Sequence, residues 1–381
     1  MAITIIVGAL CCIGLVLSLL GTWAPLNHYL IKKPPAVPPL GFFPISILKP
    51  LKGLDFELEA NLESYFNLVY PEYELLFALT SDSEPAYPVA KKLIEKYPHI
   101  KAKILVNPDQ GSGNPKVSNL LKVYETATYD WVLISDSNVF MDRDYIKILT
   151  RSVDANTGVA SAFIGGFESQ GFFGNMEATF LNGFYSRWGL TALQVGIPCV
   201  VGKTMLFQRS VANRFGGIQS FTYHIAEDFM MGVAMGLLGK KVVIANNPVK
   251  QRVGIVTRKQ FWDRHLRWGR LRKRQAPPAF FTEILFQPLT VSAFGSLFLM
   301  LQFGFHYLNS FLAFVCFFAV SDFAVMKTVN RSTSLKYLYY WLVRELAHYP
   351  LWIHIALGNT VNWRGQKYVI EIGGLVRTVN D

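Results

Sequence analysis

Residues 131–138 read WVLISDSN, an apolar run that ends directly at three polar residues. The run WVLIS has the length and composition of a buried β-strand. Asp136, Ser137 and Asn138 follow where that strand ends. One carboxylate beside an amide or a hydroxyl suits Mg²⁺ or Mn²⁺, which accept oxygen ligands, but an Asx turn after a strand has the same composition. The stretch alone predicts a strand end and leaves its chemistry open.

The segments before this strand alternate between strand and helix patterns. Apolar runs predict strands, and amphipathic spacing or a proline-led start predicts helices. The predicted strands cover residues 43–48, 73–79, 103–106 and 131–135, and the predicted helices cover residues 58–68, 85–97 and 115–127. This alternation indicates an α/β domain with a mostly parallel sheet covered on both faces. Ligands bind such sheets at the carboxyl ends of the strands, so Lys49, Asp82 and Asp136 become the first candidate site residues.

The composition excludes a uniformly water-soluble protein. The 381 residues are 51% hydrophobic and 17% charged, with a mean hydropathy of +0.26, whereas soluble domains carry about 25% charged residues. Lys and Arg total 37 against 26 acidic residues, and the net charge of +11 predicts nucleic acid, anionic lipid or a phosphate-bearing ligand as partner. The four cysteines show no metal or disulfide spacing, so we expect a reducing compartment.

An apolar segment precedes the α/β part. Residues 2–31 contain no Lys, Arg, Asp or Glu and are long enough to cross a hydrocarbon core of about 30 Å. We interpret residues 1–31 as a retained transmembrane anchor, because a cleavable signal peptide would have a basic start and a shorter apolar core. Lys32 and Lys33 follow directly and place the next region in the cytosol. Residues 38–278 are too polar to span and are predicted to form one cytosolic domain.

A second apolar region covers residues 288–357. Three segments in it are candidate spans: residues 289–305, 308–326 and 338–357. The third carries Arg344 and Glu345, which fits either a charged pair buried in the membrane or a helix on the membrane surface. The sequence leaves both alternatives open, and with them the side of the membrane on which the tail, residues 358–381, lies.

Two further segments carry charge in a pattern that suggests chemistry. Glu227 and Asp228 open an uncharged apolar segment, where they either complement a helix dipole or act as a pair of carboxylates with different pKa values. Residues 257–274 hold eight Lys or Arg residues against one Asp, with aromatic side chains interleaved. This basic segment fits an amphipathic helix on an anionic membrane, a nucleic-acid patch or an arginine clamp for a diphosphate.

The nearby spans argue against nucleic acid as the partner of the basic segment, and its other two interpretations are compatible. One face of the helix can meet lipid while Arg264, Arg267 and Trp268 point inward. We expect four cations near its end to bind anionic bilayers with a steep salt dependence; they are Arg270, Arg272, Lys273 and Arg274.

Taken together, these motifs resemble those of ceramide glucosyltransferases, which are membrane-bound GT-A glycosyltransferases. Asp136, Glu227-Asp228 and Arg264-x-x-Arg267-Trp268 occur in the order of the Asp, Asp and (Q/R)xxRW signature. Shorter motifs in register are LKPLKG (48–53), YPxYE (70–74), NPK (114–116), NL (119–120), AED (226–228) and WR (363–364). The resemblance covers nearly the whole chain, and bacterial relatives that glycosylate hopanoids share these motifs.

The resemblance implies a Rossmann-like GT-A domain and inverting transfer of glucose from UDP-glucose to the primary hydroxyl of ceramide, at the cytosolic membrane face. The alternatives are transfer of N-acetylglucosamine or galactose to a hopanoid or diacylglycerol, a polysaccharide synthase, and a non-catalytic scaffold. The implied cofactor is Mg²⁺ or Mn²⁺. The implied partners are a UDP-sugar, a lipid acceptor and an anionic membrane surface, without nucleic acid, and a bacterial inner membrane is favoured over Golgi or ER.

The resemblance also implies roles for single residues. Asp228 would deprotonate the acceptor, while Arg264 and Arg267 stabilise the leaving diphosphate and Trp268 walls the acceptor site. The implied nucleotide-sugar contacts are Lys49, Asp82, Lys116, Asp136 and Glu227, and the implied metal ligands are Asp136 and Asn138. Asp82 stands in SDSEP, where the family has an acidic cluster before proline. The aromatic-rich residues 172–193 fit a surface helix near the acceptor or an ordinary core helix equally well.

Overall fold

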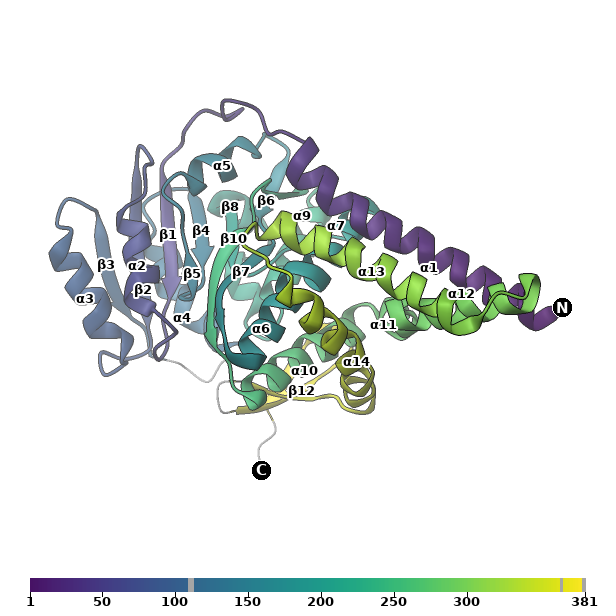
Figure 1. The fold of residues 1–381 in the computed structure, drawn as a ribbon. Helices are drawn as coiled ribbons and strands as arrows, with labels where there is room; N and C mark the ends of the chain where they lie inside the picture. Colours follow the sequence, from purple (N-terminus) through teal and green to yellow (C-terminus); the bar gives the residue numbers. More distant parts are fainter. Residues whose placement is uncertain (109–112, 364–365, 379–381) are drawn as a thin grey trace.

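The structure is a computed structural model that describes residues 1–108, 113–363 and 366–378. An α/β domain lies at one end of the molecule, and a slanting bundle of long helices projects from it (Figure 1). The N-terminus lies at the far tip of this bundle, while a small C-terminal sheet lies against the domain (Figure 1).

A seven-stranded sheet with the order β3-β2-β1-β4-β8-β6-β9 forms the centre of the domain. Its strands are β1 (Ile45–Pro50), β2 (Tyr73–Leu79), β3 (Ala102–Val106), β4 (Trp131–Ser135), β6 (Thr157–Ser161), β8 (Thr204–Gln208) and β9 (Lys241–Ile244). The first four in spatial order are parallel, and so are β6 and β9, whereas β8 runs antiparallel to its neighbours. The mostly parallel α/β sheet expected from the sequence is confirmed.

Helices cover both faces of the sheet, as the continuous apolar strand sequences require. The helices around the sheet are α2 (Leu58–Phe66), α3 (Ala86–Lys96), α4 (Pro115–Thr126), α5 (Tyr145–Arg151) and α9 (Glu227–Leu237). Ile45 and Ile47 point into the hydrophobic cluster that contains Tyr65 of α2, while Leu48 points into the opposite cluster with Val117 of α4. Alternate residues of one strand therefore anchor helices on opposite faces.

The reversed direction of β8 decides which residues meet at the edge of the sheet. Ser135, the last residue of β4, pairs with Thr204, the first residue of β8. The beginning of β8 therefore lies beside the carboxyl end of β4. Gly202 and Lys203, which precede β8, are in this way brought to Asp136.

A smaller sheet, β5-β10-β7, joins the domain to the helical part. It consists of β5 (Val139–Phe140), β7 (Ile164–Gln170) and β10 (Val249–Ile255). Strand β7 is followed in the chain by α6 (Gly171–Thr179), the π-helical turn η2 (Phe180–Tyr185) and α7 (Ser186–Gln194). Strand β10 is followed by α10 (Arg258–Gln275). Most residues of α6 and η2 are buried, which favours the core interpretation of residues 172–193. α10 begins with a capping box, in which the Thr257 side chain accepts from the Gln260 N–H and the Gln260 side chain accepts from the Thr257 N–H.

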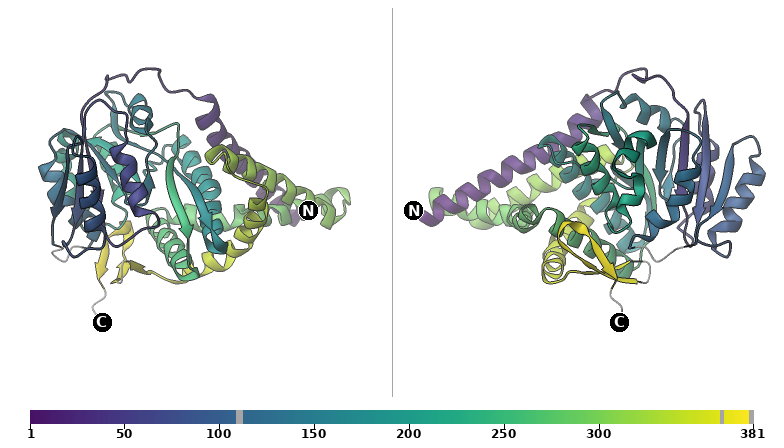
Figure 2. Two further views of the ribbon diagram at one scale, coloured as in Figure 1. Left: turned by 60° about the vertical axis from the view of Figure 1, so that its left-hand side comes forward. Right: turned by 180° about the vertical axis from the view of Figure 1, so that it is seen from behind.

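Among the residues that the structure describes, two helices are long and apolar enough to cross a membrane. They are α1 (Ala2–Leu26), continued by the π-helical turn η1 (Asn27–Ile31), and α13 (Tyr307–Val329). A third span results if the bent pair of α11 with η5 (Pro277–Phe286) and α12 (Pro288–Phe303), with an angle of 54° between them, crosses as one unit. Figure 2 shows α1, α12 and α13 side by side.

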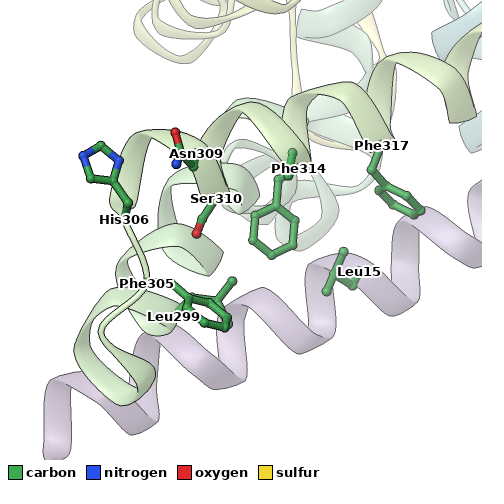
Figure 3. Close-up of a pocket in the computed structure, with 9 residues that line it drawn as sticks. Leu15, Leu299, Phe305, His306, Asn309, Ser310, Phe314 and Phe317 are labelled. Atoms are coloured by element: carbon green, nitrogen blue, oxygen red, sulfur yellow. The ribbon is translucent and has the colours of Figure 1, made fainter.

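A cavity of about 620 Å³ opens between α1, α12 and α13 (Figure 3). It is lined by Leu15, Leu299, Phe305, His306, Asn309, Ser310, Ala313, Phe314 and Phe317. Most of these side chains are apolar, as expected for a surface between helices that face lipid.

The third candidate span is α14 (Lys336–Leu357), which is long enough to cross a membrane but not apolar enough to count as a spanning helix. Its Arg344 is buried, donates to Asp322 of α13, and lies 2.5 Å from Glu345. Arg187 of α7 lies 2.9 Å from the other oxygen of Asp322. The charged pair is therefore buried among protein helices, and the position of α14 relative to the membrane stays a prediction.

Cations at the end of α10 contact other parts of the protein. The expectation that all four of them bind anionic lipid is therefore wrong in part. Lys273 is buried, and its Nζ donates to the carbonyl oxygens of Ile355, Ala356 and Gly358 at 3.0, 3.0 and 2.7 Å. Arg270 is also buried and donates to the carbonyls of residues 354 and 360. Arg272 forms a salt bridge with Glu283, with an N–O distance of 3.0 Å. Arg270 and Lys273 hold the end of α14, where backbone carbonyls lack helical partners.

Lys273→Met is expected to destabilise the protein by about 1–3 kcal/mol, because the carbonyls at the end of α14 lose a buried donor. Thermal unfolding in detergent, followed by tryptophan fluorescence, measures this change. Lys259→Met is the matched control, since Lys259 is exposed and pairs with Asp263 within one turn. An unfolding temperature equal to that of the control would contradict the capping role.

Candidate active site

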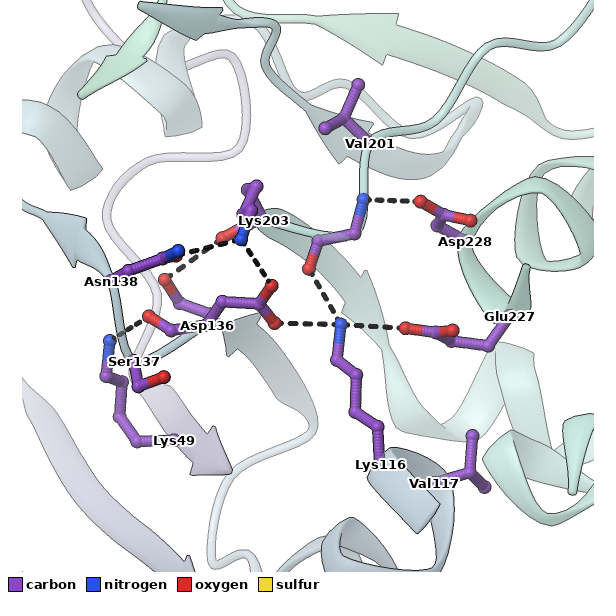
Figure 4. Close-up of polar contacts among 12 residues, drawn as sticks. Lys49, Lys116, Val117, Asp136, Ser137, Asn138, Val201, Lys203, Glu227 and Asp228 are labelled. Atoms are coloured by element: carbon purple, nitrogen blue, oxygen red, sulfur yellow. Dashed lines mark hydrogen bonds and ion pairs between the residues drawn. The ribbon is translucent and has the colours of Figure 1, made fainter. Parts of the chain in front are cut away.

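Lys116 is the centre of a cluster of charged residues at the carboxyl edge of the sheet (Figure 4). Its Nζ lies 2.8 Å from Oδ1 of Asp136 and 2.7 Å from Oε1 of Glu227, and donates to the carbonyl of Gly202 at 3.0 Å. Lys116 stands in the first turn of α4, which starts where the Asn114 side chain accepts from two backbone N–H groups. The sequence placed all three charged residues in the nucleotide-sugar site, and the structure brings them together.

Lys203 also belongs to the cluster. It directly precedes β8, the strand that runs antiparallel to β4. Its Nζ lies 3.0 Å from Oδ2 of Asp136 and donates to Oδ1 of Asn138 at 2.8 Å (Figure 4). Sequence reasoning missed Lys203 because the rule for parallel sheets selects residues after strands, whereas this lysine precedes one. The signal that could have found it is the Gly202-Lys203 pair before an apolar strand.

Lys49 lies beneath the cluster and is fully buried. Its Nζ donates to the backbone carbonyl of Asp136 at 2.6 Å and lies 3.8 Å from the ring centroid of Tyr65. Burial lowers the pKa of Lys49 well below its usual value, against the opposing charges of Asp136 and Asp55. Lys49 therefore fixes the turn after β4, and its contact with a nucleotide stays a prediction.

The lysines keep Asp136 ionised. Burial by itself would raise the pKa of this carboxyl, but the charges of Lys116 and Lys203 lower it well below the usual value. Burial likewise disfavours the charged form of Lys116, yet Asp136 and Glu227 raise its pKa. Asp136 and Lys116 therefore both stay charged at any physiological pH.

Asp228 opens α9 next to this group and has a different electrostatic environment. Its Oδ2 accepts from the Gly202 N–H at 2.7 Å and its Oδ1 accepts from the Phe229 N–H at 2.8 Å. Burial, followed by the charge of Glu227, raises the pKa of Asp228 to about 6. A carboxylate with a pKa near neutrality can accept a proton from a substrate hydroxyl.

Gly202 is the close neighbour that permits this arrangement. A Cβ atom at this position would lie 3.0 Å from Oδ2 of Asp228 and 3.2 Å from Nζ of Lys116. Any larger residue would push apart the two charged side chains that the backbone of Gly202 contacts.

Arg264 is held by a buried partner on α6. Its NH1 lies 2.6 Å from Oε1 of Glu177, and Nε2 of His265 lies 3.2 Å from the other oxygen. Although burial favours the neutral acid, the charges of Arg264 and His265 lower the pKa of Glu177 to about 2. Glu177 was missed from the sequence because it is one acid within an otherwise apolar helix.

Arg267 and Trp268 lie on neighbouring positions of α10 with different surroundings. The guanidinium of Arg267 lies 5.9 Å from the ring centroid of Trp363, in the C-terminal sheet β11 (Thr360–Trp363), β12 (Gln366–Ile370) and β13 (Val376–Thr378). Trp268 packs edge-on against Tyr185 with 4.9 Å between centroids, and Tyr185 shares a hydrogen bond with His265. The WR motif is represented by Trp363 alone, since Arg364 lies outside the described residues.

The structure does not bring Asp82 into the cluster. Asp82 is exposed on the turn after β2. Glu84 of the same SDSEP segment accepts from the Gly53 N–H at 3.1 Å and so connects this turn to the LKPLKG motif. The role of Asp82 in reading the nucleotide stays a prediction.

The oxygen donors of Asp136 and Asn138 have the chemistry that Mg²⁺ and Mn²⁺ prefer. Within the described part of the chain, no group of three or more His, Cys, Asp or Glu side chains gathers in a way that could hold a metal ion. Each predicted ligand oxygen faces an ammonium group of Lys116 or Lys203. The two residues therefore fit a divalent cation on the condition that a lysine withdraws.

Comparison with known proteins assigns a family to this site. Residues 5–376 match the model of glycosyl transferase family 21. The chain is 31% identical over 363 residues to ceramide glucosyltransferase 1 of Caenorhabditis elegans, covering 92% of this chain and 76% of that protein. It is 28% identical over 422 residues to a ceramide glucosyltransferase of Komagataella phaffii, with coverages of 86% and 82%.

A solved structure supports the fold. The chain resembles a mannosyltransferase of Pyrobaculum calidifontis, which was solved with GDP-Man and Mn²⁺, with a TM-score of 0.52 and 16% identity over 93% of this chain and 98% of the other. At this identity the likeness concerns the fold, and it agrees with the GT-A architecture expected from the sequence.

Lys116→Met is expected to destabilise the protein by up to about 3 kcal/mol, because Asp136 and Glu227 lose a buried counter-ion. The double variant Lys116→Met with Glu227→Gln should recover part of this loss, since one uncompensated charge is removed with it. Denaturant unfolding of the wild type, both single variants and the double variant measures the coupling. Additive effects in this cycle would contradict a direct bridge.

Proposed function

This chain belongs to glycosyl transferase family 21, and from that membership we propose that it transfers glucose from UDP-glucose to the primary hydroxyl of ceramide and so forms glucosylceramide. The observation that carries the proposal is the convergence of Asp136, Lys116 and Asp228 at one edge of the sheet. A group that stays anionic and a carboxylate that titrates near neutrality stand side by side there.

In the proposed reaction the ceramide hydroxyl oxygen attacks C1 of glucose from the face opposite the diphosphate. The bond between C1 and the phosphate oxygen breaks, UDP leaves with the electron pair, and the hydroxyl proton passes to Asp228. One displacement of this kind inverts the configuration at C1. A general base in such a position contributes about 10²–10⁴-fold to the rate.

The remaining residues serve the donor and the leaving group. Lys116 places positive charge at the end of β4, while Arg264 and Arg267 add fixed positive charge at the departing phosphates. Asp136 and Asn138 would hold Mg²⁺ or Mn²⁺, which when bound supplies further positive charge at the diphosphate. The proposed nucleotide-sugar contacts are Lys49, Asp82, Lys116, Asp136 and Glu227, and Trp268 walls the acceptor site.

The membrane helices fit this substrate. Ceramide keeps its tails in the bilayer while the sugar nucleotide arrives from water, so transfer has to occur at the interface. We place the α/β domain in the cytosol, because Lys32 and Lys33 follow the first span. A bacterial inner membrane is our proposed location.

Purified protein in liposomes with Mg²⁺ or Mn²⁺ tests the function directly. UDP-glucose, UDP-galactose and UDP-N-acetylglucosamine are offered against ceramide, a hopanoid alcohol and diacylglycerol, and the products are identified by mass spectrometry. We expect glucose on ceramide. Transfer only to another lipid, or of another sugar, would contradict the assignment of that substrate.

Asp228→Asn should abolish turnover while UDP-glucose binding survives, because the amide cannot accept the proton but keeps the shape of the side chain. Initial rates and calorimetric binding of UDP-glucose separate the two effects. Asp144→Asn is the control, since Asp144 is largely exposed and pairs with Lys147. Turnover within tenfold of the control would show that the base is another group.

The pH profile should report the same carboxylate. Since Asp228 must be ionised to act, kcat/KM of the wild type is expected to fall as the pH drops below about 6. Glu227→Gln removes the neighbouring negative charge that raises this pKa, so the acidic limb should move to lower pH. An acidic limb that does not move in this variant would contradict the assignment.

A further inference from the structure

Lys203 contacts both residues that are expected to bind the divalent cation. Its Nζ lies 3.0 Å from Oδ2 of Asp136 and 2.8 Å from Oδ1 of Asn138. No sequence motif assigned it a role, and it reaches the site only because β8 runs antiparallel to β4. The lysine thus stands where the two oxygens of a cation site converge (Figure 4).

The charges of the cluster are already balanced without a cation. The ammonium groups of Lys116 and Lys203 face the carboxylates of Asp136 and Glu227 at distances between 2.7 and 3.0 Å. A divalent cation beside Asp136 would add two positive charges next to two ammonium groups, and the repulsion is strong in a partly buried site. The diphosphate of a nucleotide sugar adds negative charge to the site, which offsets this repulsion and allows the cation to bind.

Lys203 is better suited to move than Lys116. Lys116 bridges two carboxylates and also donates to the carbonyl of Gly202, and its side chain is 9% exposed. The side chain of Lys203 is 16% exposed and belongs to the turn before β8. A change of rotamer can carry its ammonium group from Asp136 to an incoming phosphate, to which a lysine binds as a point charge.

We propose that Lys203 competes with the divalent cation for Asp136 and Asn138 and moves to the diphosphate when the nucleotide sugar binds, so that the cation binds together with the nucleotide and not before it. This inference rests on the proposed function in one respect, namely that the donor carries a diphosphate. It makes Lys203 a donor-binding residue and gives the site an order of binding.

Mn²⁺ binding to the purified full-length protein, followed by electron paramagnetic resonance, tests the order without any sugar transfer. The wild type should bind Mn²⁺ weakly alone and about tenfold or more tightly with UDP, in keeping with the coupling of close charges. Lys203→Gln should bind Mn²⁺ about tenfold more tightly than the wild type in the absence of UDP. In EDTA the same variant should bind UDP about tenfold more weakly.

Two further variants control for charge and for folding. Lys203→Arg keeps the positive charge and should behave like the wild type. Lys240→Gln removes a lysine from the opposite end of the sheet, where Lys240 donates to the carbonyl of Ala155, and should change neither affinity. A single cooperative unfolding transition in each variant shows that the protein is folded.

Mn²⁺ binding by Lys203→Gln that is no tighter than that of the wild type would overturn the proposal. So would tight binding of Mn²⁺ by the wild type without UDP, or no Mn²⁺ binding with UDP. These results are independent of the acceptor and of the sugar, because neither is present. A protein that shows the expected Mn²⁺ and UDP coupling but glucosylates no ceramide would contradict the proposed function alone.

Discussion

The ammonium group of Lys116 lies between the carboxylates of Asp136 and Glu227, at 2.8 and 2.7 Å, and connects three parts of the fold that are far apart in sequence. It joins the start of α4, the carboxyl end of β4 and the start of α9. Through α9 it fixes the position of Asp228, whose carboxylate is held in addition by the backbone of Gly202. The proposed roles of Asp136 as a permanent anion and of Asp228 as the general base both depend on this bridge.

A second set of buried charges connects the site to the membrane helices. Arg264 is fixed by Glu177 on α6, and six residues later on the same helix Arg270 holds the end of α14. α14 in turn pairs with α13 through Arg344 and Asp322. The helix that presents the (Q/R)xxRW motif is thereby tied to α13, one of the helices that are long and apolar enough to cross a membrane.

Much of this could be predicted from the sequence, because β4 is an apolar run, β2 is apolar apart from Glu74, and the charged residues after them are few. Lys116, Asp136 and Glu227 were identified and do converge, while their individual roles stay predictions. Lys203 was not identified, because its place depends on the direction of β8. Arg270 and Lys273 at the end of α10 were misinterpreted, since their acceptors on α14 lie more than eighty residues away in sequence and no local pattern reveals them.

We propose that the diphosphate of the donor binds at the carboxyl end of β4, within the cluster organised by Lys116. A structure of the full-length protein with UDP and Mn²⁺, determined in a lipid nanodisc, tests this proposal. We expect phosphate oxygens within hydrogen-bonding distance of Lys116 or Lys203, with Asp228 facing the space where the sugar would lie. A diphosphate bound elsewhere, with the contacts of Asp136 to both lysines unchanged, would contradict it.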